Sequence, residues 1–232
     1  MRKVQFANNY HYHIYNRGVD KRKIFLEDQD YYRFIHDLFE FNDLDATINL
    51  GRRFNERGST SIKTIKTTKK RRKKLVEIMC FCLMPNHFHL ILKQIRECGI
   101  TKFMHKIGTG YTMYFNKKYQ RTGALFEGRF KAIMIEKDEY LIHLSRYIHM
   151  NPIELIESNW KEKGIRNWEK VIEFLEQYRW SSYLDYIGNH NFPSVISKGL
   201  LLKYFRGKED YKHFVISWLQ KDMEQITNLL LE

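Results

Sequence analysis

The sequence predicts an α+β fold: a ferredoxin-like four-stranded antiparallel sheet with helices on one face, followed by a helical C-terminal extension. Strand-like and helix-like segments follow one another in the order strand, helix, strand, strand, helix, strand, helix. Pro85-Asn86 joins two of these strands as the turn of a hairpin. After residue 153 only helical patterns are clear. We therefore expect one sheet domain, residues 1–153, and an extension, residues 154–232.

The first half of the sheet domain is predicted from local patterns. Residues 10–15 are aromatic and β-branched, and Asn16-Arg17-Gly18 ends them with a turn signal, which is typical of a strand. Residues 28–42 carry apolar side chains at helical spacing and predict an amphipathic helix. Residues 75–84 form an apolar run typical of a buried strand, and residues 87–93 are expected to run back beside it.

The second half repeats the pattern. Residues 100–118 have helical spacing, and residues 130–136 follow as a strand. Residues 138–150 predict a helix, which Asn151-Pro152 ends because proline has no backbone N–H to donate and its ring clashes with the preceding turn. Further helices are expected at residues 165–177, 197–205 and 209–230.

A long basic insertion, residues 43–74, shows neither the helical nor the strand period of apolar residues. Its part from residue 52 to residue 74 holds eleven Lys or Arg and one acidic residue, a charge of +10, out of +13 for the whole chain of 232 residues. Such a concentration favours a polyanionic partner, because each phosphate that is neutralised releases condensed counterions. An ordinary solvated loop would show the same charge.

The composition excludes several classes of protein. The N-terminal residues have no apolar run after their charges, so no secretory signal is expected, and no apolar stretch could span a membrane. Three cysteines cannot form a disulfide framework, which indicates a reduced, cytoplasmic protein. No phosphate-binding glycine loop, nucleophile-elbow motif or Cys-x-x-Cys pair is present.

Three short segments carry residues suited to chemistry. In the strand of MPNHFHLIL, His87 and His89 point to the same face, where two imidazoles can ligate one divalent metal. On the helix of YIHMNP, Tyr147 and Asn151 are four residues apart and share a face, which could place a nucleophile beside a metal ligand. Arg129 and Lys131, where a strand begins, suit contacts with a DNA backbone. Each segment alone is also consistent with an ordinary surface or core role.

Five motifs follow one another along the chain. They are YHIYNRG (12–18), MPNHFHLIL (84–92), GALFEGRFKA (123–132), EYLIHLSRYIHMNP (139–152) and YRWSSYLDYIG (178–188). In this order the motifs resemble those of the REP-associated tyrosine transposases. That family is a branch of the single-tyrosine insertion-sequence transposases with a histidine–hydrophobe–histidine (HUH) motif. The resemblance covers most of residues 10–188 except the basic insertion.

The resemblance implies an activity and a set of site residues. His87 and His89 would be the HUH metal ligands, Asn151 the third ligand and Tyr147 the nucleophile, on the HUH endonuclease fold, whose sheet is the ferredoxin-like one. The implied reaction is metal-dependent cleavage and rejoining of single-stranded or hairpin DNA through a 5′-phosphotyrosine, with Mg²⁺ or Mn²⁺ as the cofactor. The protein would act as a monomer or a homodimer. The expected DNA contacts are Arg17, Arg121, Arg129 and Lys131.

Two other functions remain open at this stage. A non-catalytic nucleic-acid binder could use the sheet as RNA-recognition modules do, with Tyr10, Tyr12 or Phe88 stacking on bases. A replication initiator or relaxase would share the HUH chemistry, although such proteins usually carry larger accessory domains or a different strand order. His143, one helical turn before Tyr147, could help to remove the tyrosine proton, although a core or structural role suits it better.

Overall fold

The computed structural model describes residues 4–45 and 72–218, which contain a four-stranded sheet. The strands are β1 (His11–Arg17), β2 (Val76–Met84), β3 (His87–Gln94) and β4 (Lys131–Ile135). They lie in the order β2-β3-β1-β4, and each neighbouring pair is antiparallel. This is the ferredoxin-like arrangement, so the predicted fold class is confirmed.

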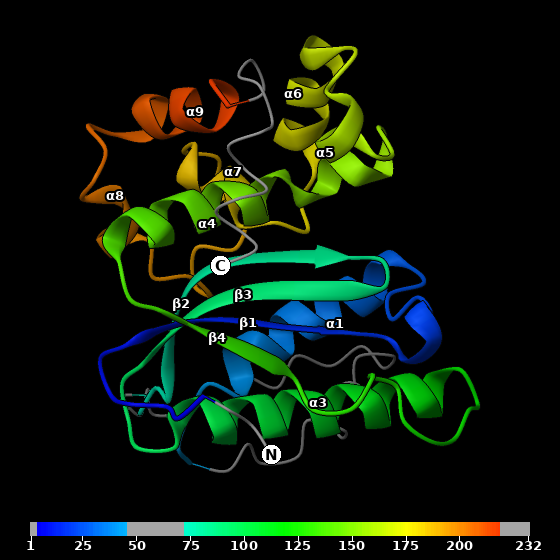
Figure 1. The fold of residues 1–232 in the computed structure, drawn as a ribbon. Coiled ribbons are helices and arrows are strands. Elements are labelled where there is room, and N and C mark those ends of the chain that lie inside the picture. The colour runs from blue at the N-terminus through cyan, green and yellow to red at the C-terminus, as the bar shows by residue number, and fades with distance from the viewer. Residues whose placement is uncertain (1–3, 46–71, 219–232) are drawn as a thin grey trace, which may run out of the picture.

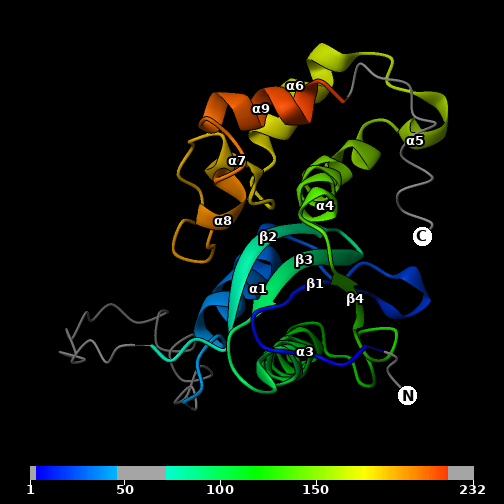
Figure 2. The ribbon, with the colours of Figure 1, turned by 60° about the vertical axis from the view of Figure 1, so that its left-hand side comes forward.

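The two helices between the strands share one face of the sheet. They are α1 (Asp28–Glu40) and α3 (Gly99–Lys118); in Figure 1, α3 lies below the sheet and α1 lies behind its strands. The helix that follows the last strand, α4 (Asp138–Met150), crosses the opposite face (Figures 1 and 2). The sheet is therefore sandwiched, and its second face meets the helix on which the sequence places Tyr147.

Strand alternation decides which side chains enter the core beneath the sheet. Tyr12 and Ile14 of β1 and Phe88 of β3 are buried, and the Phe88 ring lies 5.1 Å from that of Phe34 on α1. The pairing register sets Ile14 opposite Leu90, so that apolar side chains of adjacent strands lie side by side. The side chains that alternate with these along each strand point to the opposite face. His87 and His89 of β3 are among them and consequently face α4.

The helix α4 begins and ends where the sequence predicts. Asp138 and Glu139 occupy its first turn, where negative charge favours the helix dipole. Pro152 follows its last residue, and the chain continues into a 3-10 helix, η3 (Asn151–Leu155), instead of a further α-helical turn. A second 3-10 segment, η1 (Val19–Lys21), follows β1.

The C-terminal part of the described chain consists of short helices. They are α5 (Trp160–Lys163), α6 (Trp168–Gln177), α7 (Tyr183–Tyr186), α8 (Gly199–Leu202) and α9 (Lys208–Ile216). The sequence predicts α6, α8 and α9, though with longer bounds for all three, and it misses α5 and α7, which are too short to show a period. The predicted continuation of the last helix beyond residue 218 lies outside the described residues. Within residues 4–45 and 72–218, no helix is long and apolar enough to cross a membrane.

The C-terminal segment packs on the sheet domain through its aromatic residues. The Trp180 ring stacks on Tyr31 of α1 at 4.6 Å, and the Tyr186 hydroxyl donates to the Met79 carbonyl of β2. The backbone near Ser181 also pairs with the outer edge of β2, since Leu83 N–H donates to the Trp180 carbonyl and Ser182 N–H to the Phe81 carbonyl. An otherwise open sheet edge is thereby covered.

A buried polar network ties α9 to α4. His149 has no solvent exposure, and its Nδ1 and Nε2 lie 2.7 Å from the Tyr211 hydroxyl and 2.8 Å from the Ser182 hydroxyl. Burial lowers the pKa of His149 to about 3. The imidazole therefore stays neutral in the folded protein while the unfolded chain takes up a proton near pH 6.5.

This network predicts a loss of stability in mild acid. Below pH 6.5 the unfolded state binds a proton at His149 that the folded state cannot, so the free energy of unfolding falls as the pH falls towards about 3. By pH 5 the loss from this one group is about 2 kcal/mol. Urea unfolding of the wild type and of His149→Gln at pH 7 and pH 5 measures it. The variant is expected to have a smaller free energy of unfolding at pH 7 but to lose less of it between pH 7 and pH 5. Equal losses in the two proteins would contradict the assignment of the acid effect to His149.

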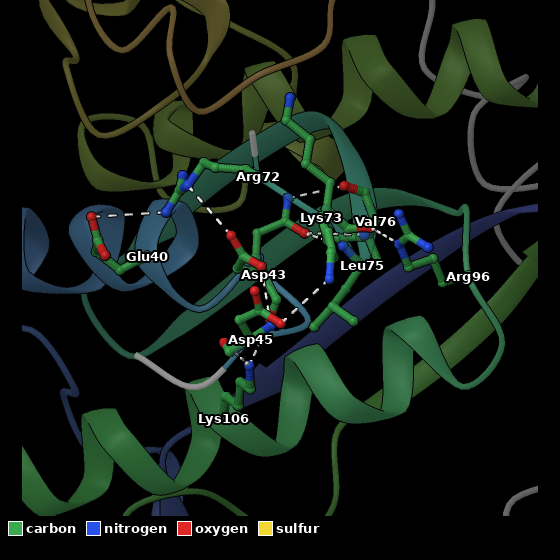
Figure 3. A network of polar contacts seen from close by, with 11 residues as sticks. Glu40, Asp43, Asp45, Arg72, Lys73, Leu75, Val76, Arg96 and Lys106 are labelled. Atoms are coloured by element: carbon green, nitrogen blue, oxygen red, sulfur yellow. Dashed lines mark hydrogen bonds and ion pairs between the residues drawn. The ribbon is translucent and has the colours of Figure 1, made fainter. Parts of the chain in front are cut away.

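The ends of the basic insertion are held side by side (Figure 3). Arg72 lies 3.9 Å from the Asp43 carboxylate and Lys73 lies 3.8 Å from that of Asp45, while Leu44 N–H donates to the Lys73 carbonyl. The side chain of Asn42 bonds the backbone of Leu75 and Val76. Arg72 and Lys73 are thus engaged with carboxylates. The part of the predicted insertion from residue 46 to residue 71 lies outside the described residues.

Candidate active site

The two histidines of β3 face α4, away from the core beneath the sheet. Between them Phe88 points to the other side and is buried against α1, as alternation in a strand requires. The rings of His87 and His89 are 5.1 Å apart and nearly perpendicular. The Tyr147 ring lies 6.2 Å from that of His89. The sequence-based expectation that both imidazoles stand on one face therefore agrees with the geometry.

Hydrogen bonds orient both imidazoles. His87 Nδ1 lies 2.7 Å from Asn86 Oδ1, while the Asn86 amide nitrogen donates to the Lys21 carbonyl. Because that oxygen can only accept, Nδ1 of His87 carries the proton and Nε2 keeps its lone pair. His89 Nδ1 lies 2.9 Å from His13 Nε2, and in the tautomer in which His89 Nδ1 donates to His13, Nε2 of His89 keeps its lone pair for a ligand. Such a fixed tautomer is typical of metal-binding histidines.

The environment keeps these histidines neutral. Burial, together with the nearby charges of Lys161 and Arg17, lowers the pKa of His87 to about 4. Burial also holds the pKa of His89 well below its usual value, and that of His13 at about 4. A neutral imidazole has the free lone pair that metal binding requires, so the site needs no deprotonation at neutral pH.

The helix α4 brings Tyr147 and Asn151 to the same place. The Asn151 side chain is buried, and its amide nitrogen donates to the Tyr147 carbonyl one turn earlier at 3.1 Å. This bond fixes the amide, whose oxygen is the atom able to ligate a metal. Tyr147, Asn151, His87 and His89 all line one pocket of about 690 Å³.

A lysine missed in the sequence completes the surroundings of Tyr147. Lys161 of α5 donates from Nζ to the Tyr147 hydroxyl at 2.9 Å, and its ammonium lies 4.5 Å from the centre of the tyrosine ring. It lines the same pocket. Lys161 and Tyr147 lie fourteen positions apart in the sequence, and no helical or strand period relates them. Only the fold therefore reveals the contact.

The structure does not place His143 beside the Tyr147 hydroxyl. Its Nδ1 lies 2.7 Å from Arg146 Nη2, and its ring lies 6.0 Å from that of Phe214 on α9. Among the described residues that line the pocket, His143 is absent. These contacts give His143 a packing role. The side chain that contacts the Tyr147 hydroxyl is Lys161.

The expected DNA contacts fall into two groups. Arg17 and Lys131 line a second pocket, which adjoins the first because both include His87; there Arg17 pairs with Glu127. Arg121 is engaged with the Asn116 side chain and the Ala124 carbonyl, which holds the loop before β4. Arg129 lines a separate cavity between that loop and α3. Arg17 and Lys131 are thus the pair nearest to the histidines.

The side chains of the pocket fit a divalent ion that accepts both nitrogen and oxygen ligands. In the described ranges, 4–45 and 72–218, no group of three or more His, Cys, Asp or Glu is arranged to hold a metal. A metal at this pocket would therefore need the amide oxygen of Asn151 beside two imidazole nitrogens. A set of only three protein donors leaves positions open for a substrate and water, as a catalytic site requires.

Comparisons with known proteins agree with this arrangement. Residues 46–151 match the family model described as "Transposase IS200 like". A solved structure described as "Structure of the REP associates tyrosine transposase bound to a REP hairpin" is 13% identical; the match covers 85% of this chain and 90% of that one, with a TM-score of 0.50. No curated protein sequence gives a significant match. The family match confirms the resemblance to insertion-sequence transposases predicted from the motifs, and the solved structure shows that the fold is shared.

Proposed function

We propose that this protein cleaves and rejoins single-stranded or hairpin DNA through a 5′-phosphotyrosine on Tyr147, with the help of a divalent metal. One observation carries the proposal. His87 and His89 from β3, Tyr147 from α4 and Asn151 directly after α4 line the same pocket, although up to 64 positions separate them in the sequence. A tyrosine hydroxyl beside two oriented imidazoles suits nucleophilic attack on a phosphodiester.

The chain's own residues would perform the reaction as follows. His87, His89 and Asn151 would hold Mg²⁺ or Mn²⁺, and the ion would supply positive charge to draw electrons from the scissile phosphate. The Tyr147 oxygen attacks phosphorus and the 3′ oxygen of the preceding nucleotide leaves. The phosphotyrosine conserves the bond energy, so a 3′-OH from another strand can displace the tyrosine and rejoin DNA without a nucleotide cofactor.

Basic side chains around the pocket suit a DNA strand. Lys21 and Lys23 line it together with the histidines, while Arg17 and Lys131 line the adjoining pocket. Ammonium and guanidinium groups bind phosphate without regard to sequence, so these four would hold the backbone on either side of the cut. A hairpin is the DNA form named for the similar solved structure, and we propose a hairpin or single strand as the substrate here.

One copy of the chain carries the whole set of proposed residues. Because Tyr147 faces the histidines of its own sheet, a monomer would be sufficient for cleavage.

The cysteines bear on the compartment. Cys80 and Cys82 are buried and, like Cys98, free, as is usual in a reducing compartment, and we place the activity in the cytoplasm.

A non-catalytic role through base stacking on the sheet is less well supported. Tyr12 and Phe88, two of the three aromatic residues that it would use, are buried, with Phe88 against Phe34 of α1 and Tyr12 against Phe6. Tyr10 is exposed but lies before β1 begins. Bases could not reach the two buried rings without unpacking the core.

Cleavage of a labelled hairpin oligonucleotide with a single-stranded flank tests the proposal. With Mn²⁺ we expect a denaturation-resistant protein–DNA adduct on the 5′ side of the cut, and with EDTA no cut. Free 5′-phosphate ends without an adduct would indicate water as the nucleophile and would contradict the proposal.

The basic insertion gives a separate prediction on affinity. Residues 52–71 hold eight Lys or Arg and one Glu, a charge of +7, and exclude Arg72 and Lys73, which are paired with carboxylates. If this segment contacts the backbone, its deletion should reduce the slope of log affinity against log salt by up to about 5, since each phosphate contributes about 0.7 for single strands. Fluorescence anisotropy at several salt concentrations measures the slope. An unchanged slope would leave the segment a solvated loop.

A further inference from the structure

We propose that Lys161 is a further catalytic residue, whose ammonium stabilises negative charge on the Tyr147 oxygen both when it attacks DNA and when it leaves. The inference rests on the proposed function, since it requires Tyr147 to be the nucleophile. It assigns a role to a residue outside the five motifs and outside the helix that carries the tyrosine.

The contact is direct and points at the reacting atom. Lys161 Nζ donates to the Tyr147 hydroxyl at 2.9 Å, a normal hydrogen bond between an ammonium and an oxygen. In the described part of the chain, Lys161 forms no salt bridge with a carboxylate, although Glu154 and Glu162 line the same pocket. Its charge is therefore not neutralised by a neighbouring acid and acts on the tyrosine oxygen.

The local fold holds Lys161 at this position. It follows Trp160, whose indole is among the largest fully enclosed side chains and anchors α5 against the core. The helix is bounded by Asn159 and Gly164, both at positive φ, so that the chain turns sharply on either side. The lysine thus projects from an anchored single turn of helix and is more restricted than a surface lysine.

The position of the ammonium suits this role. A positive charge within hydrogen-bond distance of the Tyr147 oxygen attracts negative charge that develops on that oxygen.

The role is the same in both directions of the reaction. In cleavage the Tyr147 oxygen–phosphorus bond forms and the phosphorus–O3′ bond breaks; the phenol proton passes to water, and the departing O3′ takes a proton from water. In rejoining, O3′ gives up its proton, its bond to phosphorus forms, and the tyrosine leaves as phenolate and is reprotonated. In both directions the Lys161 ammonium donates to the Tyr147 oxygen, which carries part of the negative charge in the transition state.

The test compares Lys161→Gln with a matched control on the same helix. Lys163 has the same charge, lies two residues away and is exposed, so Lys163→Gln should leave the rates unchanged. At saturating hairpin DNA and Mn²⁺, Lys161→Gln should slow adduct formation about 100-fold, and should slow rejoining from the purified adduct by a similar factor, while the Kd for DNA stays the same. Lys161→Arg keeps the charge and should recover most of both rates.

Two outcomes would overturn the inference alone. If Lys161→Gln weakened DNA binding but kept the wild-type rate at saturation, the lysine would only anchor the backbone. If it formed and resolved the adduct like the wild type, the contact would have no catalytic role. Failure of the wild type to form any adduct would instead overturn the proposed function, so the two failures are distinguishable.

Discussion

Tyr147→Phe is expected to bind hairpin DNA like the wild type and to lose cleavage by at least about 10⁴-fold, as happens when the nucleophile of a covalent enzyme is removed. The change removes one oxygen and leaves the ring beside His89 and beneath the Lys161 ammonium. The expected loss is therefore chemical and not structural. Single-turnover cleavage at saturating DNA, with affinity measured in parallel, gives both quantities.

Tyr140→Phe is the matched control for this experiment. Tyr140 lies on α4 two turns before Tyr147 and is half-buried, so the same oxygen is removed from the same face of the same helix. Its variant should cleave at nearly the wild-type rate. Cleavage by Tyr147→Phe together with failure of Tyr140→Phe would move the nucleophile and contradict the site.

Loss of a metal ligand is expected to have the second largest effect. His87→Ala and His89→Ala should each reduce cleavage more than about 100-fold at limiting Mn²⁺, because even partners that only orient a ligand are worth about 10- to 100-fold. His13→Ala, which removes the partner of His89 Nδ1, should fall within that smaller range. Excess Mn²⁺ should rescue His13→Ala further than the other two. Titration of cleavage rate against Mn²⁺ measures the shift.

His190→Ala provides the control for the metal prediction. His190 is exposed in the C-terminal segment and does not line the pocket. Its replacement therefore tests whether loss of a histidine outside the pocket also changes the metal dependence of cleavage. Equal metal dependence in the wild type, His87→Ala and His89→Ala would exclude these histidines as ligands.

Regular periodicity explains what the sequence could reveal. His87 and His89 alternate with buried Phe88 in a strand, and Tyr147 and Asn151 are one helical turn apart, so each pair could be placed on a face without knowledge of the fold. The order of these elements then predicted the ferredoxin-like sheet that brings the two pairs together. Motif resemblance added the roles that spacing alone left open.

The features missed in the sequence depend on contacts between distant segments. Lys161 meets Tyr147 through a four-residue helix with no period, and His13 meets His89 across two strands whose register the sequence did not define. The backbone near Ser181 covers the edge of β2 a hundred residues away. Such contacts follow from how elements pack, which no local pattern encodes.

Identification of the DNA-linked residue by mass spectrometry tests the central claim most directly. The wild-type protein would be trapped with a hairpin oligonucleotide and Mn²⁺, digested with protease and nuclease, and the peptide that carries a nucleotide fragmented. The account predicts a nucleotide joined by its 5′ phosphate to the hydroxyl of Tyr147 in the peptide that ends α4. A nucleotide on any other residue, or cleaved DNA with no modified peptide, would contradict it.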